Sequence, residues 1–448
     1  MSFDTVLVAN RGEIALRVID ACRELGLRSV AVYSEGDASM PYLERADASV
    51  CVGPAEPSKS YRNIAAIISA AELTGAQAIH PGYGFLAEDP HFVEVCDEHG
   101  LTFVGPTVET MRRVGDKVAA RETLAEAGVP VLPGAAVPDG EDALLAAAEE
   151  VGYPLLVKPV YGGGGRGMRL VPSADELLSL TASARAEAKA ACGDPSLYLE
   201  RAIVEPRHVE VQILADEAGA VVHLGERECS IQRRHQKMIE ESPAPRLDDG
   251  LRNCLCEAAI VASRATGYRS AGTVEFLVDR EGAFFFVEMN ARIQVEHPVT
   301  EVVTGTNLIA EQLRIAAGEP LRWRQETIEL RGHAIECRVT AEDAGNGFAP
   351  SCGTARIEEL PGGNGIRLDT VLFDGMVVSP HYDSLLAKVI AWGRDREEAR
   401  ARVETALERF RVAGVATTAS FLGHVVADPA FRRGETTTGL VGRLLDER

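Results

Sequence analysis

Residues Glu288 to His297 (EMNARIQVEH) alternate polar and apolar side chains. Successive side chains of extended backbone point to opposite sides, so Glu288, Asn290, Arg292, Gln294 and Glu296 should share one face. Carboxylates, amides and a guanidinium form no hydrophobic core, but together they could bind cations and anions, as a site for metal and phosphate must. The run would span roughly 26 Å if fully extended. We therefore expect the strand to bend near its arginine and wrap around its ligands.

The segment before this run predicts a β-hairpin, with two β-rich stretches around a turn that contains Gly282. A two-residue loop at Glu281 and Gly282, or a four-residue loop, would place Glu275 opposite Glu288, whereas a three-residue loop would break that register. Opposed carboxylates repel each other across a strand pair. Magnesium prefers a few carboxylate oxygens plus substrate phosphates, which predicts a metal site at Glu275, Glu288 and Asn290. The alternative is a solvated face of an edge hairpin.

Composition limits the possible partners. The chain has 448 residues, enough for two or three domains, and its hydrophobic content of 46% is that of an ordinary soluble globular protein. A formal net charge of -21 argues against nucleic acid or an anionic membrane as a partner. Any polyanionic ligand must then be bound by a local cluster of positive charge.

The cysteines and the N-terminus favour a cytoplasmic protein. The nine cysteines stand mostly alone, and no CxxC pair occurs, which suits reduced thiols better than disulfides or a zinc site. The first ten residues, MSFDTVLVAN, predict a short strand and lack the basic and apolar regions of a signal peptide.

Lysine is rare in this chain, which has six lysines against 40 arginines. Such a chain should use lysine mainly where a compact, flexible ammonium matters. The bias therefore ranks Lys117, Lys158 and Lys237, which all lie in motifs, as candidate ligand contacts.

Helix-like and β-rich segments divide the chain into three parts. Strands that alternate with helices predict a parallel α/β unit over about 1–114, and 108–128 is expected to be one helix. A small unit at about 131–203 and a β-rich segment with a helix near 307–317 follow. Beyond Pro320, the chain changes character again. We expect an α/β and α+β multidomain protein with boundaries at 1–114, 115–325 and 326–448.

Two motifs predict anion sites. Lys158 precedes a glycine loop, Gly162 to Gly165, that Arg166 follows. Glycines let backbone N–H groups approach phosphate oxygens, so a mobile phosphate lid is favoured over a flexible surface turn. The second motif, RRHQK at 233–237, is a positive cluster in an acidic chain, although an exposed ion-pair face would look the same.

Together these motifs resemble biotin carboxylase, an ATP-grasp enzyme, across essentially the whole chain. The resemblance rests on VANRGEIALRVI (8–19), HPGYGFLAE (80–88), GDK (115–117), GGGGRGM (162–168), RRHQK (233–237), EMNARIQVEHPVTE (288–301) and RGHAIECRV (331–339). It implies an N-terminal parallel α/β domain, a central ATP-grasp domain with a mobile lid at about 131–203, and a mixed, β-rich C-terminal domain. The implied activity is the ligase half-reaction of an acetyl-CoA or acyl-CoA carboxylase, which carboxylates biotin through carboxyphosphate and serves fatty acid biosynthesis.

The resemblance also implies roles for individual residues. The nucleotide contacts would be Lys117, Lys158, Gly164, Gly165, Glu200, Arg201, Ile203, His208, Gln232 and His235. Two magnesium or manganese ions would bind to Glu275, Glu288 and Asn290. Bicarbonate would contact Lys237, Arg292, Gln294 and Val295, with Glu296 as its base. Biotin would meet Tyr83 and Arg338.

No Ala-Met-Lys-Met motif occurs, so we expect the biotin on a separate carrier protein or on a longer form of this chain. The implied partners are a biotin carboxyl carrier protein and one or more carboxyltransferase chains, and a homodimer is possible. Another ATP-grasp ligase that activates bicarbonate or a carboxylate is a rival interpretation, which the NRGEIA, HPGYGF and RGHAIECR segments oppose. A catalytically silent ATP-binding module is a second rival.

Overall fold

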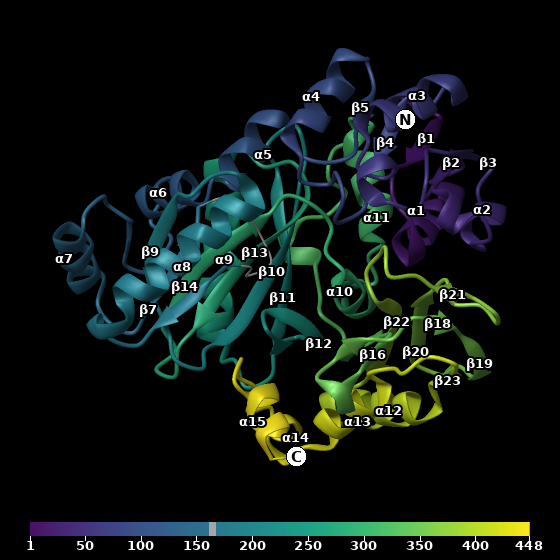
Figure 1. The fold of residues 1–448 in the computed structure, drawn as a ribbon. Coiled ribbons are helices and arrows are strands. Elements are labelled where there is room, and N and C mark those ends of the chain that lie inside the picture. The colour runs from purple at the N-terminus through teal and green to yellow at the C-terminus, as the bar shows by residue number, and fades with distance from the viewer. Residues whose placement is uncertain (161–166, 448) are drawn as a thin grey trace.

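The computed structural model describes residues 1–160 and 167–447. An N-terminal unit, a central unit and a C-terminal unit pack around a common centre, and the two chain ends lie at opposite sides of the molecule (Figure 1). None of the described helices is long and apolar enough to cross a membrane.

The N-terminal unit is built on a parallel sheet in the order β3-β2-β1-β4-β5. Every residue of β1 (Thr5–Val8) is buried. Val6 packs in one hydrophobic cluster with residues of α1 (Gly12–Glu24), whereas Leu7 packs in another with residues of α3 (Ile64–Thr74). A parallel strand covered on both faces carries a nearly continuous apolar run, here Val6 to Val8, which confirms the predicted parallel α/β unit. The other elements are β2 (Arg28–Tyr33), α2 (Tyr42–Arg45), β3 (Ala48–Cys51), β4 (Ala78–His80), α4 (Pro90–Glu98) and β5 (Thr102–Phe103).

The single helix expected over 108–128 is wrong, because the chain forms α5 (Val108–Gly115) and α6 (Lys117–Glu126) instead. The carboxylate of Asp116 accepts hydrogen bonds from the backbone N–H groups of Val118 and Ala119, both at 3.1 Å, and so starts a new helix. This break places Lys117 in the first turn of α6, at the edge of the cavity described below.

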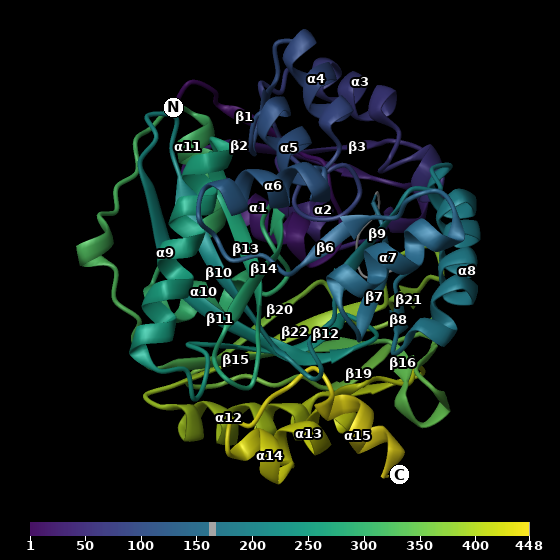
Figure 2. The same ribbon diagram turned by 90° about the vertical axis from the view of Figure 1, so that its left-hand side faces the viewer.

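A small unit projects beside the central one (Figure 2). Its sheet has the order β6-β9-β7-β8, and its hydrophobic core contains only residues of this segment. The glycine loop expected to close over phosphates lies outside the described residues, including Gly164 and Gly165. The elements are β6 (Gly134–Ala136), α7 (Glu141–Val151), β7 (Leu155–Pro159), β8 (Arg169–Val171), α8 (Ala174–Cys192) and β9 (Leu197–Arg201).

One antiparallel sheet continues from the central unit into the C-terminal unit, in the order β14-β13-β10-β11-β12-β15-β22-β20. Val209 and Val211 of β10 pack in one cluster with residues of α9, while Arg227 of β11 bonds to Thr300 of α10. The two helices therefore cover opposite faces. The strands are β10 (Arg207–Ala215), β11 (Val221–Arg233), β12 (Gln236–Ser242), β13 (Ser270–Val278), β14 (Phe284–Asn290), β15 (His333–Thr340), β20 (Ile366–Thr370) and β22 (Leu385–Gly393); the helices are α9 (Asp249–Thr266), α10 (His297–Thr304) and α11 (Leu308–Ala316).

The remaining C-terminal elements flank this sheet, and α12 (Arg396–Arg409) packs against β22 and β15. Short strand pairs and three further helices complete the unit, as Figure 1 shows in yellow-green and yellow. They are β16 (Glu342–Asp343), β17 (Ala349–Pro350), β18 (Gly353–Thr354), β19 (Arg356–Glu359), β21 (Val377–Val378), β23 (Arg411–Ala413), α13 (Ala419–Ala427), α14 (Pro429–Arg432) and α15 (Leu440–Asp446).

The predicted hairpin forms, and Glu275 faces Glu288 as expected. The predicted loop is wrong, however, because the N–H of Asp279 bonds to the carbonyl of Ala283 and leaves a three-residue loop. That loop alone would shift the register. A β-bulge between Glu275 and Phe276, where Val287 is the extra residue, restores it.

Candidate active site

One cavity of about 1050 Å³ between the three units is lined by all the described residues that the sequence predicted to form a site. These are Tyr83, Lys117, Lys158, Glu200, Arg201, Ile203, His208, Gln232, His235, Lys237, Glu275, Glu288, Asn290, Arg292, Gln294, Val295, Glu296 and Arg338. Of the residues predicted there, only Gly164 and Gly165 are not placed, since they lie outside the described residues.

The polar run at 288–296 leaves its strand after Asn290, where β14 ends. A bend at Ala291 and Arg292 and a turn at Val295 and Glu296 lead directly into α10. The expected bend is therefore confirmed. It brings the polar side chains from the strand, the turn and the helix start to the same cavity instead of spreading them along one strand.

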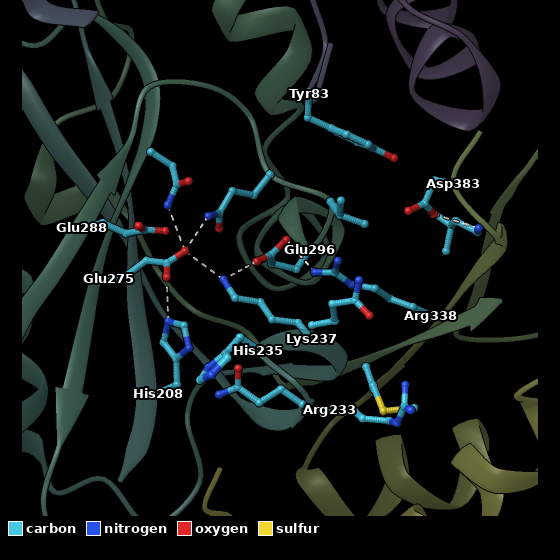
Figure 3. A pocket seen from close by; sticks show the side chains of 18 of the residues that line it. Tyr83, His208, Arg233, His235, Lys237, Glu275, Glu288, Glu296, Arg338 and Asp383 are labelled. Atoms are coloured by element: carbon cyan, nitrogen blue, oxygen red, sulfur yellow. Dashed lines mark hydrogen bonds and ion pairs between the residues drawn. The ribbon is translucent and has the colours of Figure 1, made fainter. Parts of the chain in front are cut away.

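Lys237 lies at the centre of this cavity (Figure 3). Its ammonium donates to Glu210 at 2.5 Å, Glu296 at 2.7 Å and Glu275 at 2.9 Å. Burial alone would lower the pKa of Lys237, but the three carboxylates raise it well above its ordinary value, so the side chain stays charged. A cation held by carboxylates from three segments fixes β10, β13 and the start of α10 around one point.

Arg338 of β15 reaches the same carboxylate from the C-terminal unit. Its Nη2 donates to Glu296 at 2.9 Å and its Nε to Glu240 at 2.6 Å. Burial would raise the pKa of Glu296, but Lys237 and Arg338 lower it strongly, so Glu296 is ionised. Burial raises the pKa of Glu240 to about 7. Two cations thus converge on one carboxylate, the arrangement in which a small anion could replace part of that carboxylate's contacts.

The paired carboxylates of the hairpin each have a cation partner. Glu275 accepts from Lys237 and forms an ion pair with His208 at 2.8 Å, while Glu288 lies 3.3 Å from Lys117. Burial would lower the pKa of His208, but Glu275 raises it. Asn290 donates to Glu275 at 2.9 Å, so three oxygen-bearing side chains meet here. Carboxylate and amide oxygens suit a hard divalent cation, so these residues fit the predicted metal.

At the far end of the cavity, Glu200 of β9 accepts from Arg121 at 2.6 Å and forms an ion pair with Lys158 of β7. Arg201 and Ile203 follow it along the wall. His235, which also lines the cavity, occupies a two-residue turn between β11 and β12, with positive φ values at Arg234 (50°) and His235 (65°). Non-glycine residues are held in that region only where the surroundings determine it.

Tyr83 marks the end of the cavity nearest the N-terminal unit. Its hydroxyl donates to Glu13, and Figure 3 shows the hydroxyl end of the ring pointing toward Asp383. Arg11 and Tyr382 line the same end of the cavity, and the guanidinium of Arg11 lies 3.8 Å from the centre of the Tyr382 ring.

Glu210, Glu240 and Arg227 belong to the site but were not predicted from the sequence. Arg227 is fully buried and donates to Glu210 at 2.5 Å and to Gln294 at 3.1 Å. It therefore positions Gln294 of the cavity wall and the carboxylate of Glu210 that accepts from Lys237. A signal for Glu210 was present, because His208, Glu210 and Gln212 alternate with apolar residues in β10. Glu240 carries no such signal, since Glu241 follows it directly.

Comparison with known proteins agrees with this geometry. Residues 2–111 match the biotin carboxylase N-terminal domain, 116–324 the ATP-binding domain of the carbamoyl-phosphate synthase L chain, and 336–443 the biotin carboxylase C-terminal domain. The chain is 52% identical to the biotin carboxylase of Pseudomonas aeruginosa, over 96% of each chain. It is 48% identical to a pyruvate carboxylase subunit of Methanothermobacter thermautotrophicus, over 98% of this chain and 89% of that one.

Solved structures of related proteins are also similar to this chain. A biotin carboxylase complex with β-gamma-ATP from Campylobacter jejuni is 46% identical, with a TM-score of 0.96 and coverage of 98% of this chain and 99% of that one. The 2-oxoglutarate carboxylase biotin carboxylase domain of Hydrogenobacter thermophilus, solved as a dimer with MgADP, ADP and bicarbonate, is 45% identical, with a TM-score of 0.95 and coverage of 99% and 98%. The chain belongs to the biotin carboxylase family of ATP-grasp ligases. Its activity is that of a biotin carboxylase.

Proposed function

We propose that this cavity carboxylates biotin in two linked steps, with bicarbonate and ATP first forming carboxyphosphate. The observation that carries the proposal is the direct contact of Lys237 and Arg338 with one ionised carboxylate, Glu296. The same cavity is lined by Lys117 and by Glu288. An anion held beside Lys237 would therefore face a metal-bound nucleotide held beside Lys117 and Glu288.

Bicarbonate binds between Lys237, Arg292, Gln294 and the backbone at Val295 in this proposal, and Glu296 removes its proton. The lowered pKa of Glu296 makes it a weak base in the empty cavity. A bound anion changes this, because it competes for the charge of Lys237 and repels the carboxylate of Glu296, which raises the pKa of Glu296.

The nucleotide end supplies positioning and charge. Lys117 and Lys158 contact phosphates, Glu200, Arg201 and Ile203 meet the base, and His208, Gln232 and His235 complete the ribose and phosphate contacts. Gly164 and Gly165 are proposed to close over the phosphates. Two Mg²⁺ or Mn²⁺ ions at Glu275, Glu288 and Asn290 would neutralise charge as the phosphoryl group transfers. The support is the oxygen-donor set and the nucleotide, magnesium and bicarbonate named for the Campylobacter and Hydrogenobacter proteins.

Biotin enters beside Tyr83 and Arg338. Carboxyphosphate breaks down to carbon dioxide and phosphate, and the phosphate takes the N1 proton of biotin. Arg338 stabilises the resulting enolate, since its guanidinium is planar and always charged. The deprotonated N1 then bonds to the carbon of the released carbon dioxide, which gives carboxybiotin.

We also propose the wider setting. Biotin arrives on a separate carboxyl carrier protein, and a carboxyltransferase transfers the carboxyl group to an acyl-CoA, in the cytoplasm. A homodimer has the support of the Hydrogenobacter dimer. The proposed domains are 1–114, 115–325 with a lid at 131–203, and 326–448, which the three matched family ranges and the separate core of the small unit support.

The test is ATP cleavage by the purified chain with bicarbonate, in the presence and absence of free biotin. We expect cleavage to require bicarbonate and to increase with biotin, and carboxybiotin to accumulate. Turnover of an amine without stimulation by biotin would instead favour another ATP-grasp ligase. The molecule that finally accepts the carboxyl group needs a separate test, because one relative is a subunit of a pyruvate carboxylase. Pull-down of the native protein, with mass spectrometry of its partners, would identify the carboxyltransferase and with it the acceptor.

A further inference from the structure

Lys388 of β22 is a lysine for which neither the sequence motifs nor the proposed mechanism gives a role. Its side chain is fully buried. Burying an ammonium is costly unless charged or polar partners compensate for its lost hydration. The partners of this group therefore indicate what its burial achieves.

Those partners come from three parts of the chain. The ammonium of Lys388 donates to the carbonyl oxygen of Val295 at 3.0 Å and forms ion pairs with Glu13 at 3.0 Å and Asp369 at 3.7 Å. Glu13 belongs to α1 of the N-terminal unit, and Asp369 to the neighbouring strand β20. Burial would lower the pKa of Lys388, but the two carboxylates raise it, so the ammonium is charged.

The contact with Val295 is the one that bears on the reaction. The peptide bond that follows this carbonyl joins Val295 to Glu296. A trans peptide is planar, so its N–H points away from its C=O. With the carbonyl held by Lys388, the N–H of Glu296 must point in the opposite direction from β22.

The same turn is restrained at a second point. The Nδ1 of His297 lies 2.7 Å from the carbonyl oxygen of Gln294, and the ring is fully buried. Burial lowers the pKa of His297 well below its ordinary value, so the ring is neutral and its Nδ1–H can donate. Two successive carbonyls of this turn are thus bound by side chains outside the cavity: that of Gln294 by His297, and that of Val295 by Lys388.

We propose that Lys388 is a positioning residue that holds the Val295 carbonyl and thereby presents the N–H of Glu296 to bicarbonate as an anion donor. The proposal rests on the bicarbonate site proposed above. It adds a backbone donor to that site, together with the buried cation that orients it. Through Glu13, which also accepts from the hydroxyl of Tyr83, the same cation links the bicarbonate turn to the biotin end of the cavity.

The substitution Lys388→Met tests this with a side chain of similar length and no charge. In the biotin-independent reaction, we expect the KM for bicarbonate to rise on the order of tenfold, since a misaligned donor to a charged ligand loses about one strong hydrogen bond. The KM for ATP should stay within about twofold, because the nucleotide contacts are elsewhere. Lys59→Met, at an exposed lysine, is the matched control and should change neither constant.

The variant Lys388→Gln keeps a donor and should give a bicarbonate KM between those of Lys388→Met and the native protein. It also serves if the methionine variant does not fold. An unchanged bicarbonate KM in the folded variant, or equal rises in the KM values for bicarbonate and ATP, would overturn the positioning role. Absence of bicarbonate-dependent ATP cleavage in the native protein would instead contradict the proposed function, so the two failures are distinguishable.

Discussion

At the scale of single residues, the candidate site holds several buried carboxylates, and only a few cations balance their charge. Lys237 contacts three carboxylates and Arg338 two, so each cation holds several buried carboxylates in place, and in the proposed mechanism it also acts in the reaction. Removing one partner of a buried ion pair leaves an uncompensated charge, which costs several kcal/mol. Substitutions here must therefore be measured for folding as well as for activity.

The two residues that contact each other at the centre should fail in different half-reactions. Glu296→Ala should lower bicarbonate-dependent ATP cleavage by about 10²–10⁴-fold with or without biotin, because the proton acceptor is lost. Arg338→Gln should retain a slow, biotin-independent ATP cleavage and lose carboxybiotin formation. Steady-state ATP cleavage and carboxybiotin assays separate these outcomes. Equal defects in biotin-independent cleavage would show that Arg338 also positions bicarbonate.

Glu240 should make the stability of the protein depend on pH. Because burial raises its pKa from 4.5 to about 7, the folded protein keeps a proton that the unfolded chain releases in this window. The stabilising contribution is complete below pH 4.5 and is lost as the pH rises through 7. Glu240→Gln cannot lose that proton, so its unfolding free energy relative to the native protein should increase by on the order of 3 kcal/mol across the window.

Urea unfolding at several pH values measures this difference. Glu358→Gln, at an exposed position of β19, is the control and should show no such trend. A difference between Glu240→Gln and the native protein that is independent of pH would contradict the assignment.

At the scale of elements, the sequence predicted side-chain pairing better than backbone detail. The alternation of 288–296 and the β-rich run before it were enough to predict that Glu275 faces Glu288. The three-residue loop and the compensating bulge could not be predicted, since both depend on how β13 and β14 pack. The break at Asp116 was readable in principle, because an aspartate before Lys117 is a typical helix cap.

The hairpin predicts a selective defect in metal use. Glu288→Gln should raise the KM for ATP at limiting magnesium by roughly tenfold or more, since one anionic ligand of the proposed metal site is lost. The side chain is 30% exposed, and its partner Lys117 is 34% exposed, so the unfolding free energy of the ligand-free protein should change by less than about 1 kcal/mol.

The control is Glu281→Gln in the exposed loop of the same hairpin, which should leave magnesium dependence unchanged. Titration of ATP cleavage against magnesium, with thermal unfolding of each variant, provides the measurement. Native magnesium dependence in Glu288→Gln would remove this residue from the metal site.

At the scale of the whole molecule, the three units and most of the site could be predicted because long motifs carry the family resemblance. The sequence could not predict that the central sheet continues into the C-terminal unit. β12 and β15 pair although residues 243–332 separate them, and neither strand's own pattern identifies its neighbour. For the same reason, Glu240 and Glu241 give no sign in the sequence that their partners lie on the far side of the proposed boundary.

That continuity predicts that the fragments 1–325 and 326–448 will not fold separately. In the first fragment, the edge of β12 would lose its ladder with β15, and an unpaired strand edge favours aggregation. Glu241, which is fully buried, would also lose His333 and Arg396, each at 2.7 Å, and so would become an uncompensated buried charge.

We expect the 1–325 fragment to aggregate and to show no bicarbonate-dependent ATP cleavage, and 326–448 to lack a cooperative unfolding transition. Co-expression should restore part of the activity, since all the partners are then present. Size-exclusion chromatography and calorimetry beside the full chain make the comparison, and a monodisperse 1–325 fragment that cleaves ATP with bicarbonate would contradict the view of the shared sheet as one folding unit.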